Sequence, residues 1–208
     1  MDPTSVYLSS EMPDRADHLW RYTSWKKTHP TGDVREIPDD ISSPKVVLRT
    51  IDGSPIPEGI TLLHQKTDSE GLPDEETITK SFLEAVTKNS KFTLSVSPRF
   101  RSSIPIIVDI QAEGDYCAAH LCLEVGKLSE FEMVTLIRGD CDWFGLMRTG
   151  STGEGSICND VLVNKMTGGS LLRVESVSIP RNSQFKSGTV SSGFRDLCSM
   201  DSIDISNQ

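Results

Sequence analysis

Two neighbouring stretches of alternating apolar and polar residues constrain the fold most strongly. In residues 91–97, Phe92, Leu94 and Val96 alternate with Thr and Ser, and in residues 106–111 Ile or Val recurs at every second position. Since successive side chains of a strand point to opposite faces, each stretch offers one apolar face and one mostly polar face. The short polar connection between them predicts two consecutive antiparallel strands of a sandwich or barrel.

The overall charge limits which partners the whole surface can attract. The 208 residues include 21 Lys and Arg against 30 Asp and Glu, which gives a formal net charge of −9. A field of this sign repels nucleic acid and anionic membranes, so contact with either requires a local basic patch. The length suits one domain of about 150 residues with a tail at each end.

The sequence contains no motif for targeting, metal binding or catalysis. No apolar run approaches the ~18 residues of a membrane span, and no signal peptide is apparent, so we expect reduced cysteines in a cytosolic or nuclear protein. Cys117, His120 and Cys122 lack the paired short spacings of a zinc site. No GxSxG, GxGxxG or complete phosphate-binding loop is present. We therefore expect no catalytic residue, no metal and no other cofactor.

Composition divides the chain into three regions. Residues 1–43 form a polar arm with one candidate helix over residues 14–27. Residues 44–180 are expected to form the β-sandwich domain, with a helix inserted at residues 75–88, where apolar residues fall at helical spacing. Residues 181–208 are Ser-rich with little apolar content, which predicts a mostly disordered tail. No internal repeat is apparent.

An aromatic and basic cluster in the arm is the first candidate nucleic-acid contact. Aromatic rings stack on unpaired bases, while Lys and Arg neutralise phosphates. The residues concerned are Trp20, Arg21, Trp25, Lys26 and Lys27. The same composition also suits a helix at a membrane interface or a short helix that docks its tryptophans on the β domain. All three interpretations stay open.

A second basic patch surrounds the first alternating stretch. Its residues are Lys88, Lys91, Arg99 and Arg101. Cations in such positions either bind phosphates or face solvent at the end of a strand, and the sequence does not decide between the two.

Three serines in the tail are candidate phosphorylation sites. Ser199, Ser202 and Ser206 lie near acidic residues. Phosphorylation would add negative charge and weaken contacts with RNA or acidic partners, whereas an unmodified solvated tail fits the same composition.

The order of these segments resembles the plant-virus movement proteins of the 30K superfamily. Residues 59–68 would supply a strand with an aspartate near its end, and Asp68 would be that aspartate. Residues 91–111 would supply the next pair of strands, and residues 118–128 the strand that follows. The resemblance covers about residues 45–138. It implies a jelly-roll-like sandwich in which Asp68 is structural.

We therefore predict a mainly β protein, an antiparallel β-sandwich of jelly-roll type with one inserted helix and flexible termini. The resemblance implies a viral movement-type protein that assists cell-to-cell transport of a viral genome through plasmodesmata. Such a protein binds single-stranded nucleic acid or its nucleoprotein without sequence preference, and its affinity falls steeply as salt rises. Further expected partners are host plasmodesmal or membrane-associated proteins and other copies of the chain, in the host cytoplasm and at the cell periphery. Two alternatives remain: a viral matrix- or coat-type protein that acts by self-assembly, and a β-sandwich module that binds a protein partner.

Overall fold

The computed structural model describes residues 2–13, 24–65, 78–192 and 195–205, with side chains up to residue 192. Within these residues, three helices precede or interrupt the strands: α1 (Pro3–Ser9), α2 (Trp25–Thr28) and α3 (Ile78–Thr87). The nine strands are β1 (Lys45–Thr50), β2 (Ile60–Gln65), β3 (Lys91–Val96), β4 (Ile106–Val125), β5 (Glu130–Ser151), β6 (Ile157–Met166), β7 (Ser170–Ile179), β8 (Gln184–Ser191) and β9 (Arg195–Ile205). α3 lies within the helix predicted at residues 75–88.

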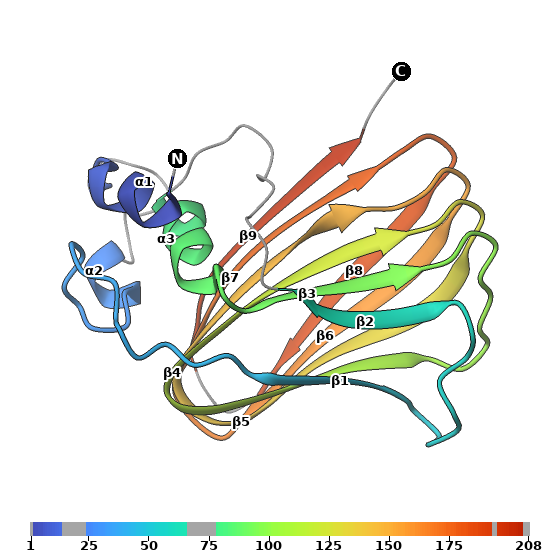
Figure 1. Cartoon of the computed structure of the whole chain (residues 1–208), viewed down its shortest axis with the longest axis horizontal. Coiled ribbons are helices and arrows are strands. Elements are labelled where there is room, and N and C mark those ends of the chain that lie inside the picture. Colours follow the sequence, from blue (N-terminus) through green and yellow to red (C-terminus); the bar gives the residue numbers. More distant parts are fainter. Residues whose placement is uncertain (1, 14–23, 66–77, 193–194, 206–208) are drawn as a thin grey trace.

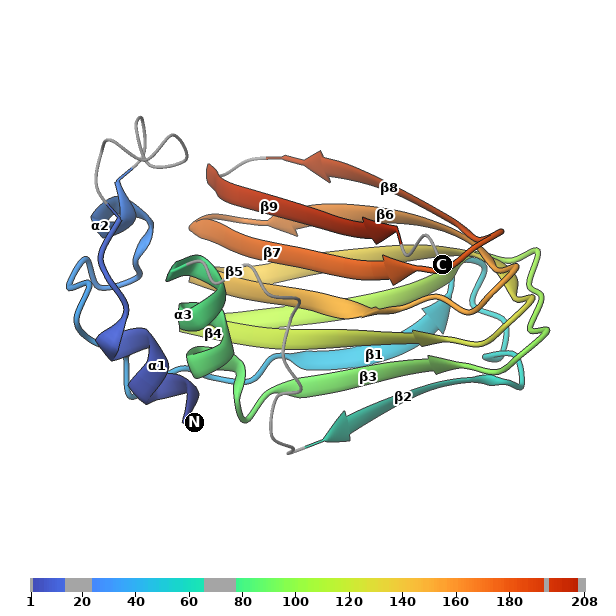
Figure 2. The ribbon, with the colours of Figure 1, turned by 90° about the horizontal axis from the view of Figure 1, so that it is seen from above.

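The strands form two stacked layers (Figures 1 and 2). The long strands β4 and β5 bend near their middle, so each contributes one half to each layer. The first layer contains β1, β6, β8 and the first halves of β4 and β5; the second contains β2, β3, β7, β9 and the second halves. The bends of β4 and β5 coincide with Gly114 and Gly139, whose φ values of 95° and 124° favour glycine. We call the side with the bends and helices the helix end, and the opposite side the turn end.

Most neighbouring strands are parallel, and the chain winds as a β-solenoid of about 4 turns. Ile106 pairs with Met133, Met133 with Asp160 and Asp160 with Ser187, so each coil follows the last by 27 residues. Among the strands of the described residues, β1 and β2 alone run antiparallel to their neighbours, β4 and β3. The predicted antiparallel jelly-roll sandwich is therefore wrong.

The physical reason for this error lies in what alternation specifies. Residues 91–96 pair in parallel with residues 120–125, and residues 106–111 pair with β1 and β5. The two stretches are consecutive along the chain but belong to different layers of one coil. Alternation decides which side chains face the interior, and it does not decide which strand lies alongside.

Buried side chains from both layers fill the space between them. The interior includes Leu94, Ile106, Val108, Leu121, Leu123, Met133, Phe144 and Leu146, each at most 1% exposed. A second apolar cluster lies outside the second layer, where the helices pack on the sheet with Tyr7, Trp25, Phe82, Leu83, Ala118, Trp143 and Leu172. The helices therefore cover one layer at the helix end (Figure 2).

The last coil occupies residues for which we predicted a disordered tail. β8 pairs in parallel with β6, and β9 with β7. Serine and threonine are compatible with this position because backbone pairing needs no particular side chain.

The turns at the turn end stack closely on one another. A Cβ atom at Gly126 would lie 2.4 Å from the backbone nitrogen of Pro98, and one at Gly153 would lie 2.4 Å from that of Lys127. Larger residues would push the coils apart. The coils thus require glycine at these two positions for their close approach.

Candidate functional site: the basic turn end

The structure places Trp25 in the core of the helix end. Trp25 is 3% exposed, and its Nε1 donates a 3.2 Å hydrogen bond to Tyr7 Oη, while Tyr7 Oη donates to the carbonyl of Val34 at 2.7 Å. Its ring also packs edge-on against Phe82. The docking interpretation therefore describes this tryptophan, and its ring has no free face for a nucleic-acid base. Lys26 and Lys27 are exposed, and Trp20 and Arg21 lie outside the described residues.

The second predicted patch is divided between the two ends of the molecule. Lys88 and Lys91 lie at the helix end, where Lys88 Nζ is 3.4 Å from Thr4 Oγ1. Arg99 and Arg101 follow β3 at the turn end (Figure 1). A strand of six residues separates the pairs by about 20 Å.

The remaining predicted residues cannot be assigned contacts. Asp68 and Ser206 lie outside the described residues, and Ser199 and Ser202 belong to β9, whose side chains are not described.

Stacking of the turns adds two further cations to Arg99 and Arg101. Charged residues follow the proline or glycine of four successive turns, at Arg99, Lys127, Glu154 and Arg181. The Arg99 N–H donates to the Lys127 carbonyl at 2.8 Å, and the Leu128 N–H donates to the Glu154 carbonyl at 3.0 Å. Ser183 Oγ donates to the Gly153 carbonyl at 2.9 Å, which holds the last turn beside the third.

We call Arg99, Arg101, Lys127 and Arg181 the basic turn cluster. All four residues are exposed. Arg101 lies 3.8 Å from Glu130 and Lys127 lies 3.9 Å from Glu154, with all four side chains more than half exposed. Pairs of this kind are weak because water screens them. Among residues with described side chains, Arg99 and Arg181 have no ion-pair partner, so the cluster retains positive charge.

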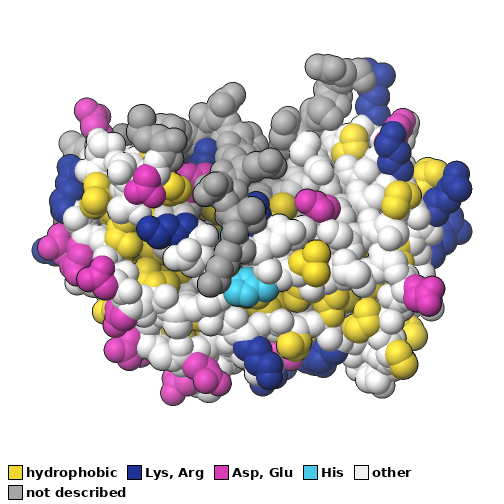
Figure 3. All heavy atoms as spheres, in the orientation of Figure 1, with side chains coloured by type: hydrophobic (Ala, Val, Ile, Leu, Met, Phe, Trp, Pro, Cys, Tyr) yellow, Lys and Arg dark blue, Asp and Glu magenta, His cyan; other side chains and the backbone are white. Residues whose placement is uncertain are grey.

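The cluster stands out against the rest of the surface. In Figure 3, Asp and Glu gather mainly over the helix end and lower left, while Lys and Arg gather at the right-hand edge, where the turns lie. Within the stacked turns the four cations exceed Glu130 and Glu154, so the basic turn cluster has a charge opposite in sign to the overall net charge of −9. Asp52, Glu58 and Glu124 are exposed at the same end, so the excess of cations is confined to the cluster.

Sequence reasoning found Arg99 and Arg101 but did not connect Lys127 and Arg181 to them. The available signal was the recurrence of proline or glycine before a charged residue, at spacings of 28, 27 and 27 residues. Without a recognised coil, that pattern resembles unrelated turns.

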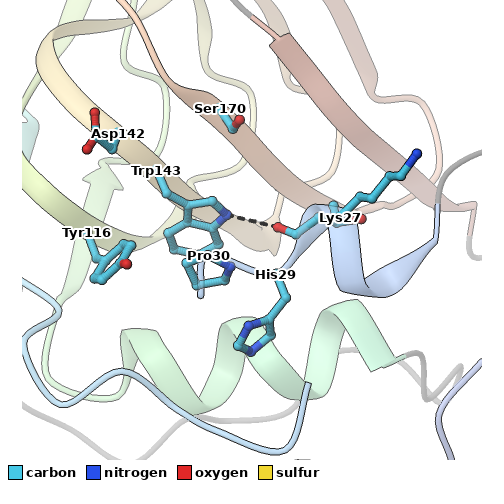
Figure 4. A pocket seen from close by; sticks show the side chains of 8 residues that line it. Lys27, His29, Pro30, Tyr116, Asp142, Trp143 and Ser170 are labelled. Carbon is cyan, nitrogen blue, oxygen red and sulfur yellow. Dashed lines mark hydrogen bonds between the residues drawn. The ribbon is translucent and has the colours of Figure 1, made fainter. Parts of the chain in front are cut away.

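A cavity at the helix end is the main alternative site. It has a volume of about 220 Å³ and is lined by Lys27, Thr28, His29, Pro30, Tyr116, Asp142, Trp143 and Ser170. Trp143 Nε1 donates to the Thr28 carbonyl at 3.2 Å, which ties the segment after α2 to the sheet. In Figure 4, Lys27 and Asp142 lie on opposite sides of Trp143, and the Lys27 amine points away. The polar groups that line the cavity do not converge on one point, so they do not form a catalytic arrangement.

A buried charge cluster lies between the layers and is structural. Arg148, with no exposed side-chain surface, bonds to Asp160 and lies 3.3 Å from Glu175, which also pairs with Arg173 at 3.2 Å. Burial alone would lower the pKa of Arg148, but the carboxylates of Asp160 and Glu175 raise it. Two cations and two carboxylates balance within the interior. Charged residues in alternating stretches are expected to face solvent, so sequence analysis did not place these side chains in the interior.

His120 and the buried cysteines of the two layers do not form a metal site within the described residues. His120 is buried and shares a 2.7 Å hydrogen bond with Thr149 Oγ1. Cys117, Cys141 and Cys158 are free thiols, and burial raises the pKa of Cys158 to about 12. Within the described ranges, no group of three His, Cys, Asp or Glu residues is arranged to hold a metal ion.

Comparisons with known proteins add no relative. No protein-family model, curated protein or solved structure matches the chain. In the part of the chain that the structure describes, no helix is both long and apolar enough to cross a bilayer.

Proposed function

We propose that the protein binds single-stranded nucleic acid without sequence preference, through the basic turn cluster and without a catalytic step. The observation that supports this is the convergence of Arg99, Arg101, Lys127 and Arg181 on one exposed edge of an otherwise acidic molecule. Neighbouring coils lie about 4.8 Å apart, so Arg99 and Lys127 stand in adjacent turns, whereas Glu154 occupies the turn between Lys127 and Arg181. A flexible phosphate backbone can contact the cations on both sides of Glu154.

Binding at this edge is electrostatic, with little contribution from base stacking. Phe100, the aromatic residue within the first turn, is 7% exposed and packs edge-on against Phe131. Four cation–phosphate contacts give a slope of about −3 for log affinity against log salt on a single strand.

The test is fluorescence anisotropy with a labelled single-stranded RNA over a salt series. Arg99→Glu with Arg101→Glu removes two of the four contacts and should reduce the slope to about half. Lys26→Glu with Lys27→Glu changes the net charge equally at the helix end and serves as the matched control. Lys127→Glu with Arg181→Glu repeats the test in case Glu is poorly tolerated at Arg99, whose φ is 63°.

The outcomes separate a local site from a general charge effect. The proposal is supported if both turn-end double variants lose RNA affinity while Lys26→Glu with Lys27→Glu binds nearly as well as wild type. Equal losses at both ends, or no binding at low salt, would contradict it.

The fuller form of the proposal is a movement-type role, in which the protein carries a viral genome to plasmodesmata at the cell periphery. Its basis is the sequence resemblance over about residues 45–138. A fluorescent fusion expressed in leaf epidermis tests it directly. Punctate signal at cell walls, with spread into neighbouring cells, supports the role, and a uniformly cytoplasmic, cell-confined signal contradicts it.

Self-assembly is the second candidate function, favoured by one observation. β8 is largely exposed and, within the described residues, pairs only with β6. An unpaired strand edge is a template for another strand. Light scattering over a concentration series checks this: growth in mass that Val190→Pro abolishes would support assembly through β8, and a constant monomer mass would exclude it.

A further inference from the structure

The outer face of the first layer is a second surface with its own chemistry. Phe131, Met133 and Ile137 of β5 belong to the interior cluster, so the residues that alternate with them face outward. The described helices pack instead on residues of the second layer. We call this surface the outer face.

Strand register arranges the outer face in rows that cross several coils. Two apolar rows run side by side: Ile107, Val134 and Val161 in one, and Leu136, Val163 and Val190 in the other. Exposure increases across the coils, from 5% at Ile107 to 39% at Val161 and 56% at Val190, so the accessible part of the two rows lies on β6 and β8. A row containing Lys45, Gln111, Arg138 and Lys165 borders them on one side. Lys186 lies on the other side, beside Asn159.

Cations outnumber carboxylates within the two apolar rows and the two rows that border them. Lys45, Arg49, Arg138, Lys165 and Lys186 oppose Asp109 and Glu132 there. The next row towards the bends carries the carboxylates Glu113 and Asp140. Asp109 is 3% exposed at its side chain and pairs with both Arg49 and Arg138, so one carboxylate offsets two guanidinium groups. In Figure 3, Lys or Arg lies beside hydrophobic side chains along the lower edge of the molecule, where β1 runs.

Asp109 holds two of these cations in place. Arg49 Nε donates to Asp109 at 3.0 Å, and Arg138 donates to both carboxylate oxygens at 2.7 and 3.2 Å. Burial tends to raise the pKa of Asp109, but the hydrogen bonds from Arg138 and Arg49 outweigh it and lower that pKa. The Arg49 and Arg138 side chains are 44% and 47% exposed, and each guanidinium group has further N–H donors beyond those that bond Asp109. They are therefore pre-ordered for a second carboxylate, which reduces the entropy lost on binding.

We infer that the outer face docks an extended acidic protein segment that carries apolar residues. Apolar side chains of the segment would lie over the two valine-rich rows, and its carboxylates would reach the bordering Arg and Lys residues. A second copy of the chain is disfavoured because two such faces have the same charge. The outward-facing positions hold none of the aromatic residues that stack on bases or anchor a protein at a membrane.

The test uses a labelled random copolymer of glutamate and tyrosine as the probe, with labelled poly-L-glutamate beside it. Lys165→Glu with Lys186→Glu reverses charge on both borders without disturbing Asp109, and Val161→Asp interrupts an apolar row. Lys26→Glu with Lys27→Glu is again the matched control. We expect the charge pair to weaken copolymer binding about tenfold, the control less than about twofold, and poly-L-glutamate to bind more weakly than the copolymer.

Each other result overturns the inference. No copolymer binding, or equal losses in the border pair and the control, would remove the outer face as a specific site. Binding of phosphatidylserine-containing vesicles that Lys165→Glu with Lys186→Glu abolishes, without copolymer binding, would replace the protein segment by a membrane. RNA binding that fails in this pair but survives in Arg99→Glu with Arg101→Glu would assign the face to nucleic acid. Because the variants differ, failure here is distinct from failure of the proposed function.

Discussion

Arg148 of the second layer faces Asp160 of the first layer across the interior, and the two form a fully buried ion pair. Glu175, the register partner of Arg148 in β7, accepts a second hydrogen bond from the same guanidinium. The pair therefore links the two layers and two successive coils.

Replacement of Arg148 by Met should be among the most damaging single changes. It leaves Asp160 buried without its cation, while Glu175 keeps its pair with Arg173, so we expect a loss of about 3–5 kcal/mol in the free energy of unfolding. Urea denaturation measures this loss, and Lys165→Met on the exposed surface should change stability by less than about 0.5 kcal/mol. The double variant Arg148→Met with Asp160→Leu keeps the Glu175–Arg173 pair and should recover part of the loss, and a single variant as stable as wild type would contradict the role of the pair.

Gly126→Ala and Gly153→Ala should each destabilise the stacked turns. The added methyl group would lie 2.4 Å from backbone atoms of the neighbouring turn, and we expect a cost of about 1–3 kcal/mol. Gly188→Ala is the matched control, since a Cβ atom there meets nothing within 4 Å. The measurement is the shift in urea midpoint; similar shifts at all three positions would argue against close stacking.

His120 should make stability fall in mild acid. Burial, assisted by Lys91, lowers the pKa of His120 from 6.5 to about 4. Below pH 6.5, His120 is protonated in the unfolded chain but stays neutral in the folded chain. The free energy of unfolding therefore has its full value above pH 6.5 and decreases as the pH falls towards 4. The full difference amounts to about 3 kcal/mol.

The check compares urea denaturation at several pH values for wild type and His120→Gln. The glutamine variant keeps a hydrogen-bonding group near Thr149 but cannot take up the proton, so its stability should decrease less between pH 6.5 and 4. Parallel pH profiles would show that other groups cause the acid sensitivity.

Trp25→Ala should affect stability and leave nucleic-acid affinity unchanged. The substitution empties part of the aromatic cluster around Phe82 and removes the donor to Tyr7, at a cost of about 3–5 kcal/mol. Anisotropy on the fraction that remains folded, at low temperature, measures RNA affinity. A large loss of affinity in folded protein would revive a direct contact between this ring and a base.

The sequence predicted the inward faces of strands better than their neighbours. Phe92, Leu94 and Val96 are all buried, as their alternation requires. The solenoid could not be predicted from side-chain patterns, because equivalent positions of successive coils carry different residue types. Ile106 and Asp160 lie in the same inward row, and one is apolar whereas the other is charged. A coil conserves backbone geometry, and the repeat is hidden when its side chains diverge.

The candidate site was predictable only where its residues are close in sequence. Arg99 and Arg101 are close in sequence and could be recognised together, whereas Arg181 joins them only through the stacking of turns. Arg148, Arg173 and Glu175 were equally inaccessible to pattern analysis, since charged residues in alternating stretches normally face solvent.

The 27-residue coil also determines where the chain tolerates changes in length. One residue inserted within β6 would exchange inward and outward positions for the rest of that strand, placing Lys165 inside and Met166 outside. The turns absorb such changes: residues 97–105 form a longer connection than residues 126–129 at the same end of the molecule. Natural or engineered variation in length should therefore be confined to the turn end. A loop grafted there leaves the inward and outward positions of the strands unchanged.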